Sequence, residues 1–281
     1  MAKILEKHLI RPPDVFSFVL EAPLISRKAR PGQFVIVRLH RRGERIPLSL
    51  ARISPEEGAI TLVVMAVGKT TREMSLLEAG DEVLDLCGPL GQPTHVYDAG
   101  RVVLVGGGFG AAPLYPIARA FREAGNEVAV ILGARSAGLL IYEEELAQVS
   151  ERVIIATDDG SKGMKGLVTE ALEAEVRDRG AGLVVAVGPA PMMKAVSDVT
   201  RPMGIKTMVS LNPIMVDGTG MCGGCRVVVS GESRFACTDG PEFDGHGVDW
   251  ENFIQRQKVY REKEKASFEE WLKRHSHVIR E

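Results

Sequence analysis

Three of the chain's four cysteines fall in one glycine-rich stretch, which constrains the fold and its chemistry more than any other segment. The stretch reads Asp217-Gly-Thr-Gly-Met-Cys222-Gly-Gly-Cys225, and Cys237 completes a D-x4-C-x2-C-x11-C pattern. Thiolates are soft ligands, so cysteines at this spacing select zinc or an iron–sulfur cluster. The glycines let the backbone wrap closely around such a group. We therefore expect a metal-binding loop here.

The fourth ligand of this loop is left open by the residues alone. Asp217 is well placed to be a ligand, but an Asp-Gly pair is also a common turn, and Asp239, His246 or Cys87 are alternatives. A bare C-x2-C with one further cysteine favours structural zinc, so the choice of metal depends on the rest of the chain. Cys87 is otherwise expected to be a small apolar core residue.

Composition excludes several classes of protein. With 281 residues, about two domains are expected. A net charge of -2 gives no electrostatic footprint for nucleic acid. No apolar run reaches the ~20 residues that cross a bilayer, and the first residues do not resemble a signal peptide. Clustered cysteines suit metal ligation in a reducing compartment. We expect a cytoplasmic protein without a membrane span.

The first part of the chain, residues 1–98, is predicted to be a small antiparallel β-barrel. Short apolar runs at 33–39 and 59–65 lie between turn signals such as Pro31-Gly32. Only residues 71–77 have a helical pattern. Short strands at this spacing are typical of a barrel.

The second part, residues 99–211, is predicted to be an α/β domain with a parallel sheet. Apolar strands alternate with helices, one of them at 112–124 with Gly125 as its C-terminal cap, and ligands of such sheets lie beyond the carboxyl ends of the strands. The predicted strands are 102–105, 128–132, 153–156, 183–187 and 207–211.

The last two segments are a metal-binding segment at 212–248, with one strand at 226–230, and a charged helical tail at 249–281. Asp249 is a suitable helix cap, and aromatic residues recur on one face of the tail. This apolar stripe either docks a partner subunit or folds back onto its own domain. Its residues are Trp250, Phe253, Ile254, Phe268, Trp271 and Leu272.

Glycine-rich turns follow three of the predicted parallel strands. Gly106-Gly-Gly-Phe-Gly110 opens a helix, an arrangement that suits a pyrophosphate, although Pro113 stands where a strict G-x-G-x-x-G has its last glycine. The acidic ribose anchor is also missing, since Gly133-Ala-Arg135-Ser136 occupies its place. Thr157-Asp-Asp-Gly160 and Gly188-Pro-Ala-Pro-Met192-Met193 follow two other strands. Together the turns predict one site, whereas each alone is compatible with an empty turn or, for the methionines, with core.

In the first domain, Arg45-Ile-Pro-Leu-Ser49 and Gly68-Lys-Thr-Thr71 form a possible diphosphate clamp. The alternative is a solvated arginine and a helix-capping threonine. The order of these motifs, with Gly80-Asp81, Gly88-Pro-Leu-Gly91 and the 106–110 turn, resembles the ferredoxin–NADP reductase superfamily. The cysteine pattern is similar to that of the electron-transfer subunit of dihydroorotate dehydrogenase, which has a cysteine where Asp217 stands. That replacement looks most like the small subunit of NADH-dependent reduced ferredoxin:NADP oxidoreductases, also described as sulfide dehydrogenase beta subunits.

The resemblance implies FAD between barrel and α/β domain, NAD(H) at the sheet edge and a 2Fe–2S cluster. FAD is implied at Arg45, Pro47, Leu48, Ser49, Gly68, Thr70 and Thr71. NAD(H) is implied at Gly107, Gly108, Gly110, Gly133, Arg135, Asp158, Gly188 and Met192. Cluster ligands are implied at Asp217, Cys222, Cys225 and Cys237. Leu48 replaces the aromatic residue of the superfamily flavin motif R-x-[aromatic]-[ST], and Arg45 stands four residues before Ser49.

The resemblance also implies the function. It is that of a subunit passing electrons between the cluster, FAD and NAD(H) in an electron-bifurcating complex, with a large flavin and iron–sulfur subunit as partner and ferredoxin as an indirect one. No catalytic acid–base pair or nucleophile is expected. The alternatives are an equivalent subunit of a hydrogenase, sulfide dehydrogenase or dihydroorotate dehydrogenase, or a zinc-containing nucleotide-sensing module.

Overall fold

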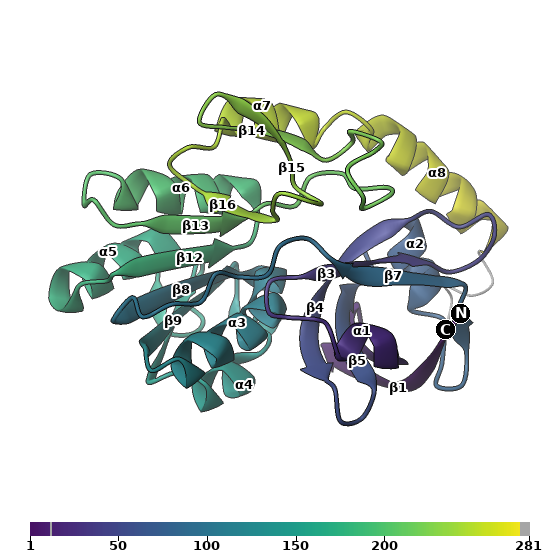
Figure 1. The fold of residues 1–281 in the computed structure, drawn as a ribbon, viewed down its shortest axis with the longest axis horizontal. Helices are drawn as coiled ribbons and strands as arrows, with labels where there is room; N and C mark the ends of the chain where they lie inside the picture. Colours follow the sequence, from purple (N-terminus) through teal and green to yellow (C-terminus); the bar gives the residue numbers. More distant parts are fainter. Residues whose placement is uncertain (12, 276–281) are drawn as a thin grey trace.

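Figure 1 shows two sheet-based units side by side, with the cysteine-bearing segment and the last helices lying along one side of them. The computed structural model describes residues 1–11 and 13–275. The predicted fold class, an antiparallel barrel followed by a parallel-sheet unit and a C-terminal iron–sulfur segment, is confirmed.

The first unit is a seven-stranded antiparallel sheet that curls into a nearly closed barrel, in the order β6-β1-β2-β5-β4-β3-β7. Alternate residues of each strand point inward, so Phe18, Leu50 and Leu62 meet in its core. Its elements are β1 (Ala2–Arg11), β2 (Val15–Glu21), α1 (Pro23–Ser26), β3 (Phe34–Arg38), β4 (Ile46–Ser54), β5 (Ala59–Met65), α2 (Lys69–Met74), β6 (Glu82–Val83) and β7 (Asp85–Leu90).

The second unit is a sheet in the order β11-β10-β9-β8-β12-β13-β16, parallel except where β16 pairs with β13. Its strands are apolar on both faces because helices cover both. Its elements are β8 (Arg101–Gly107), η1 (Gly108–Gly110), α3 (Ala111–Glu123), β9 (Glu127–Ala134), η2 (Ala137–Leu139), α4 (Glu143–Gln148), β10 (Arg152–Thr157), β11 (Met164–Lys165), α5 (Val168–Arg179), β12 (Leu183–Val187), α6 (Ala190–Thr200), β13 (Thr207–Ser210) and β16 (Glu242–Asp244).

Two cores lie on opposite faces of this sheet. Val103 and Val105 of β8 face the core that contains residues of α5 and α6, whereas Val102 and Leu104 face the core that contains residues of α3 and α4. Helix α3 ends where Gly125 adopts a φ of +86°, so the predicted glycine cap lies where it was expected.

The cysteine segment and the tail form a third layer. It contains β14 (Arg226–Val229), β15 (Glu232–Phe235), α7 (Trp250–Arg256) and α8 (Arg261–Arg274). The Asp249 side chain accepts a hydrogen bond from the Asn252 amide and caps α7, as predicted. Figure 1 shows α8 running from α7 toward α2 of the barrel, which it contacts.

The tail folds back onto its own chain. Trp250 and Phe253 belong to the core that also contains Cys225 and Cys237. Trp271 is 4% exposed and stacks on Phe268. Of the two predicted fates of the aromatic stripe, packing on its own domain is therefore the one observed.

The helices of the first unit differ from the prediction in two ways: α1, a short helix that begins at Pro23, was not predicted, and the predicted helix starts earlier than expected. The helix expected at 71–77 is α2, which begins at Lys69 and ends at Met74. The Thr71 hydroxyl accepts hydrogen bonds from the amides of Val67 and Gly68, which starts the helix earlier than the apolar pattern indicated. The strand expected at 59–65 is β5 with the same bounds, and that at 183–187 is β12.

Candidate functional site

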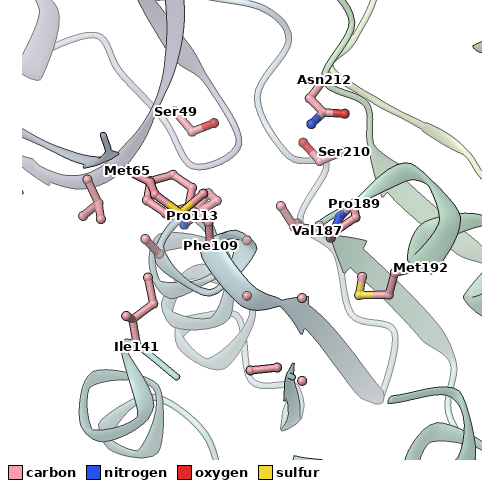
Figure 2. A pocket seen from close by; sticks show the side chains of 18 of the residues that line it. Ser49, Met65, Phe109, Pro113, Ile141, Val187, Pro189, Met192, Ser210 and Asn212 are labelled. Atoms are coloured by element: carbon pink, nitrogen blue, oxygen red, sulfur yellow. The ribbon is translucent and has the colours of Figure 1, made fainter. Parts of the chain in front are cut away.

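A cavity of about 1010 Å³ lies where the carboxyl edge of the parallel sheet meets the barrel. Figure 2 shows its two sides, with Ser49 and Met65 from the barrel facing Val187, Ser210 and Asn212 from the sheet unit. Turns after β8, β9, β10, β12 and β13 all contribute to its wall. This convergence is expected because parallel strands end at one edge.

Most of the predicted nucleotide- and flavin-binding residues line this cavity. Three come from β4 of the barrel and eight from turns at the sheet edge. They are Pro47, Leu48, Ser49, Gly107, Gly108, Gly110, Gly133, Arg135, Asp158, Gly188 and Met192.

Glycine is required at Gly110, where the backbone turns from β8 into α3. A Cβ added there would lie 2.1 Å from the carbonyl oxygen of Val187, which belongs to the backbone of β12 and cannot move cheaply. At Gly107 an added Cβ would lie 2.3 Å from Sδ of Met192. The first turn is thus packed directly against the turn after β12. Met192 lines the cavity, whereas Met193 is fully buried core.

Four predicted residues do not line the cavity. The Arg45 guanidinium instead donates from Nε to the carbonyl oxygen of Val216 at 2.8 Å. The Thr70 hydroxyl donates to the Glu44 carboxylate at 2.6 Å, and Thr71 caps α2 through the Gly68 amide. The adjoining Val67 does line the cavity, so α2 begins at its rim.

Several lining residues were missed by the sequence reasoning. Ser210 is the last residue of β13 and Asn212 follows it, so the strand-end rule that located the other turns would have found them. Phe109 lay inside a motif read only for its glycines. Arg11 and Asp14 form a 2.7 Å ion pair on the barrel side, and no local pattern indicated it.

The cysteine loop begins at the rim of the cavity. Met215 lines the cavity, and Asp217 is two residues further along the chain. Cys225 and Cys237 are buried, with their Sγ atoms 3.1 Å apart, whereas Cys222 is exposed. Burial, reinforced by Cys225, raises the pKa of the Cys237 thiol to about 12. A metal lowers such a pKa by favouring the thiolate, so binding releases protons.

Asp217 organises the backbone of this loop. One carboxylate oxygen accepts from the Thr219 amide at 2.9 Å and the other accepts from the Cys222 amide at 2.8 Å. These hydrogen bonds, that from Thr219 first, lower the pKa of Asp217 below its usual value. Asp217 is therefore the turn residue that the Asp-Gly pair indicated, and each oxygen keeps lone pairs with which to bind a metal.

The alternative fourth ligands have other partners. Asp239 accepts a hydrogen bond from the Phe235 amide, and His246 bonds to the Thr200 hydroxyl. Cys87 is partly buried and packs against the core, as expected for a small apolar residue.

The donors fit a 2Fe–2S cluster in their chemistry. Asp217, Cys222 and Cys225 lie on the loop before β14, and Cys237 follows β15, where its thiol adjoins that of Cys225. Within residues 1–11 and 13–275, no three His, Cys, Asp or Glu side chains are gathered tightly enough to hold a metal ion. Beside the loop, Arg256 donates to the Gly224 carbonyl oxygen, and its buried Nε lacks a protein partner among the described residues. The positive charge of the Arg256 guanidinium is favourable beside a site whose ligands are negatively charged thiolates.

A barrel joined to a parallel nucleotide-binding sheet, with a cysteine loop at the cavity between them, defines a reductase of the ferredoxin–NADP reductase type. The sequence model of an oxidoreductase NAD-binding domain matches residues 104–198. The model of the iron–sulfur cluster binding domain of dihydroorotate dehydrogenase B matches residues 212–249.

Comparisons along the chain agree with this class. The chain is 54% identical over 260 residues to a dihydroorotate dehydrogenase B electron-transfer subunit homologue of Thermotoga maritima, covering 92% of each. It is 34% identical to the corresponding subunit of Desulforamulus reducens, covering 89% of this chain and 98% of that one. A solved structure of NADH-dependent reduced ferredoxin-NADP oxidoreductase, reported for insight into flavin-based electron bifurcation, aligns with a TM-score of 0.91 and 51% identity, covering 97% and 98% of the two chains.

The chain belongs to the family of dihydroorotate dehydrogenase B electron-transfer subunits and their homologues. The resemblance drawn from its motifs and the predicted oxidoreductase class are thereby confirmed. FAD, NAD(H) and a 2Fe–2S cluster are the cofactors of this family, as predicted. Electron-transfer subunits work within larger complexes, so a partner subunit is implied. No helix in the described part of the chain is long and apolar enough to cross a membrane.

Proposed function

We propose that this chain is the NAD(H)-linked subunit of an electron-bifurcating, NADH-dependent reduced ferredoxin:NADP oxidoreductase. One observation carries the proposal. A single cavity, lined by the barrel and by the nucleotide-binding sheet, has the cysteine loop starting at its rim. The likeness to the solved oxidoreductase over nearly all of both chains supports the choice of complex.

The proposed division of labour follows the chain. Residues 1–98 bind FAD, 99–211 bind NAD(H) and 212–248 hold the cluster; the tail is 249–281, of which 276–281 lie outside the described residues. When bound, these groups would supply single-electron transfer at the cluster and hydride transfer between flavin and nicotinamide.

The chain's own residues then act by positioning. Pro47, Leu48 and Ser49 of β4 bound the flavin side of the cavity. Gly107, Gly108 and Gly110 bring backbone amides to the pyrophosphate at the start of the thirteen-residue helix α3.

Other groups complete the proposed sites. Arg135, Asp158, Gly188 and Met192 hold the remainder of the dinucleotide, and Gly133, which packs against Val168, lines the same wall. Gly68, Thr70 and Thr71 stand beside the rim residue Val67 and are assigned to the flavin's outer portion. Asp217, Cys222, Cys225 and Cys237 are the proposed cluster ligands.

The proposed partner is a large subunit carrying flavin and iron–sulfur clusters, with ferredoxin as its substrate, in the cytoplasm. Because Trp250 and Phe253 are core residues, removing the whole tail would damage the fold as well as any contact. Docking by the tail is better tested at Val259 and Tyr260, which are 63% and 46% exposed between α7 and α8. Val259→Glu with Tyr260→Glu should reduce co-purification of the partner, while the exposed-residue control Leu24→Glu should not.

Anaerobic purification of the native complex tests the proposal. The expected result is an assembly of this chain with a larger flavin and iron–sulfur protein that reduces ferredoxin only when NADPH and NAD+ are supplied together. A partner that oxidises dihydroorotate, sulfide or hydrogen would contradict the choice of complex. A colourless zinc protein would contradict the whole assignment.

A further inference from the structure

Arg45 is the one predicted flavin-binding residue whose side chain reaches the cysteine loop. Nε donates to the Val216 carbonyl oxygen at 2.8 Å, and Nη2 donates to the Asp217 carbonyl oxygen at 3.5 Å. The partners are more than 170 positions apart in sequence. The guanidinium thus fixes the two backbone groups that immediately precede the first glycine of the loop.

We propose that Arg45 is a positioning residue for the iron–sulfur site, locking the Asp217 end of the cluster loop to the strand that lines the flavin side of the cavity. The inference rests on the proposed function, because it requires a cluster on this loop. It assigns Arg45 to the cluster loop in place of the flavin diphosphate.

Two chain segments lead from the cavity to the loop, and Arg45 joins them. The first is 45–49, in which Pro47, Leu48 and Ser49 line the cavity. The second is 210–217, in which Ser210, Asn212 and Met215 line it. The Arg45 hydrogen bonds join the two segments at the ends that lie next to the loop. They therefore fix the loop relative to the cavity through a few residues of chain.

An apolar contact supports the same docking. Gly218 has a φ of +77°, and a Cβ added there would lie 2.6 Å from Cδ1 of Leu90 and 3.0 Å from Cγ1 of Ile36. Ile36 of β3 is the register partner of Pro47 in β4. The Asp217–Gly218 turn therefore sits on the barrel directly beside the strand that Arg45 precedes.

Arg45 positions the Asp217 carboxylate indirectly, through its contact with the Asp217 backbone. The Asp217 carboxylate spans to the amides of Thr219 and Cys222, so a shift of the Asp217 backbone moves the carboxylate and the Cys222 segment together. Groups that orient metal ligands from outside typically change affinity by about 10- to 100-fold when removed. Removing the Arg45 guanidinium should therefore loosen the cluster and leave flavin binding intact.

The test uses the anaerobically purified full-length protein and four variants. Arg45→Gln should keep the wild-type flavin-to-protein ratio, lose its cluster to a chelator about tenfold or more faster, and show an altered EPR line shape of the reduced cluster. Arg45→Lys should lose its cluster more slowly than Arg45→Gln but faster than wild type. An ammonium can reach one of the two carbonyl oxygens but cannot bind both with a planar fork. Arg42→Gln changes an exposed arginine three residues before Arg45, and this variant should match wild type.

Gly218→Ala provides a second route, since it lifts the same turn from the barrel while keeping Arg45. It should change the cluster signal as Arg45→Gln does, and it carries the test if Arg45→Gln does not fold. Loss of flavin from Arg45→Gln with an unchanged cluster signal would overturn the proposal in favour of a diphosphate contact. An unchanged cluster in whichever variants fold would overturn it outright. A wild-type protein without iron would instead refute the proposed function, and this inference with it.

Discussion

The cavity and the cysteine loop adjoin each other but are built in opposite ways. The sheet side of the cavity wall is formed by the ends of five parallel strands, and its shape depends on close packing of glycine against backbone, as of Gly110 against Val187. The loop has little regular structure between Asn212 and β14, and polar contacts to its backbone hold it. Regular structure thus shapes the proposed nucleotide site, whereas a few side chains govern the loop. Single substitutions should therefore separate the two sites.

The largest expected effect is loss of the cluster from the loop with the cavity untouched. In Cys237→Ser a hydroxyl, a poor ligand for iron, replaces a buried thiol. We expect nearly all iron to be lost while flavin content stays at the wild-type level. Cys87→Ser, which changes the cysteine outside the loop, should keep its iron. Iron and flavin assays decide the matter, and loss of the cluster from the Cys87 variant would make Cys87 a ligand.

The reciprocal change damages the cavity and spares the loop. In Gly110→Ala the new methyl group meets the Val187 carbonyl, so the turn before α3 must shift. We expect a fall in the free energy of unfolding of about 1–3 kcal/mol and a rise in KM for NADH of roughly tenfold, with the cluster's EPR signal unchanged. Gly138→Ala is the matched control, because it lies in a similar short turn with nothing within 4 Å of the added atom. If both variants had the same KM for NADH, the tight turn at Gly110 would not be a nucleotide site.

A smaller effect is expected at Glu242, where the barrel, the sheet and the segment after the cysteines meet. Its carboxyl group accepts a hydrogen bond from Thr94, and burial raises its pKa to about 7. The folded state then holds this proton more tightly than the unfolded state, so ionisation destabilises the fold as pH rises from about 4.5 to about 7. Glu242→Gln should be more stable than wild type by about 1–3 kcal/mol at pH 8 and equal to it at pH 4.

Urea unfolding at several pH values measures this difference. Glu232→Gln, which changes an exposed carboxylate on β15, is the matched control. A stability gap that is the same at pH 4 and pH 8 would contradict burial of an ionisable Glu242.

The smallest expected effect is a change in the cluster without its loss. Asp217→Asn keeps one oxygen acceptor, so one of the two hydrogen bonds to loop amides is lost. We expect iron to be retained in part, with a changed EPR line shape. Because the pKa of Asp217 is lowered, its wild-type loop contacts should persist at neutral pH and weaken only as pH falls through the folded-state pKa. An unchanged spectrum would leave Asp217 with its turn role alone.

The same contrast explains what could be predicted from sequence. The sheet strands were readable because runs such as 183–187 are apolar throughout, and the strand-end rule then located the glycine turns. The Arg45 contact with residues 216–217 was not readable, since nothing local in either segment points to the other. Nor did the sequence decide whether Trp271 is buried against its own chain or against a partner, because an apolar stripe specifies burial without specifying the surface that covers it.

The most direct measurement is the cofactor content of the anaerobically isolated full-length chain, followed by addition of NADH. The account predicts one flavin and one 2Fe–2S cluster per chain, with NADH bleaching the flavin absorbance. A chain that binds NADH but contains neither iron nor flavin would contradict it.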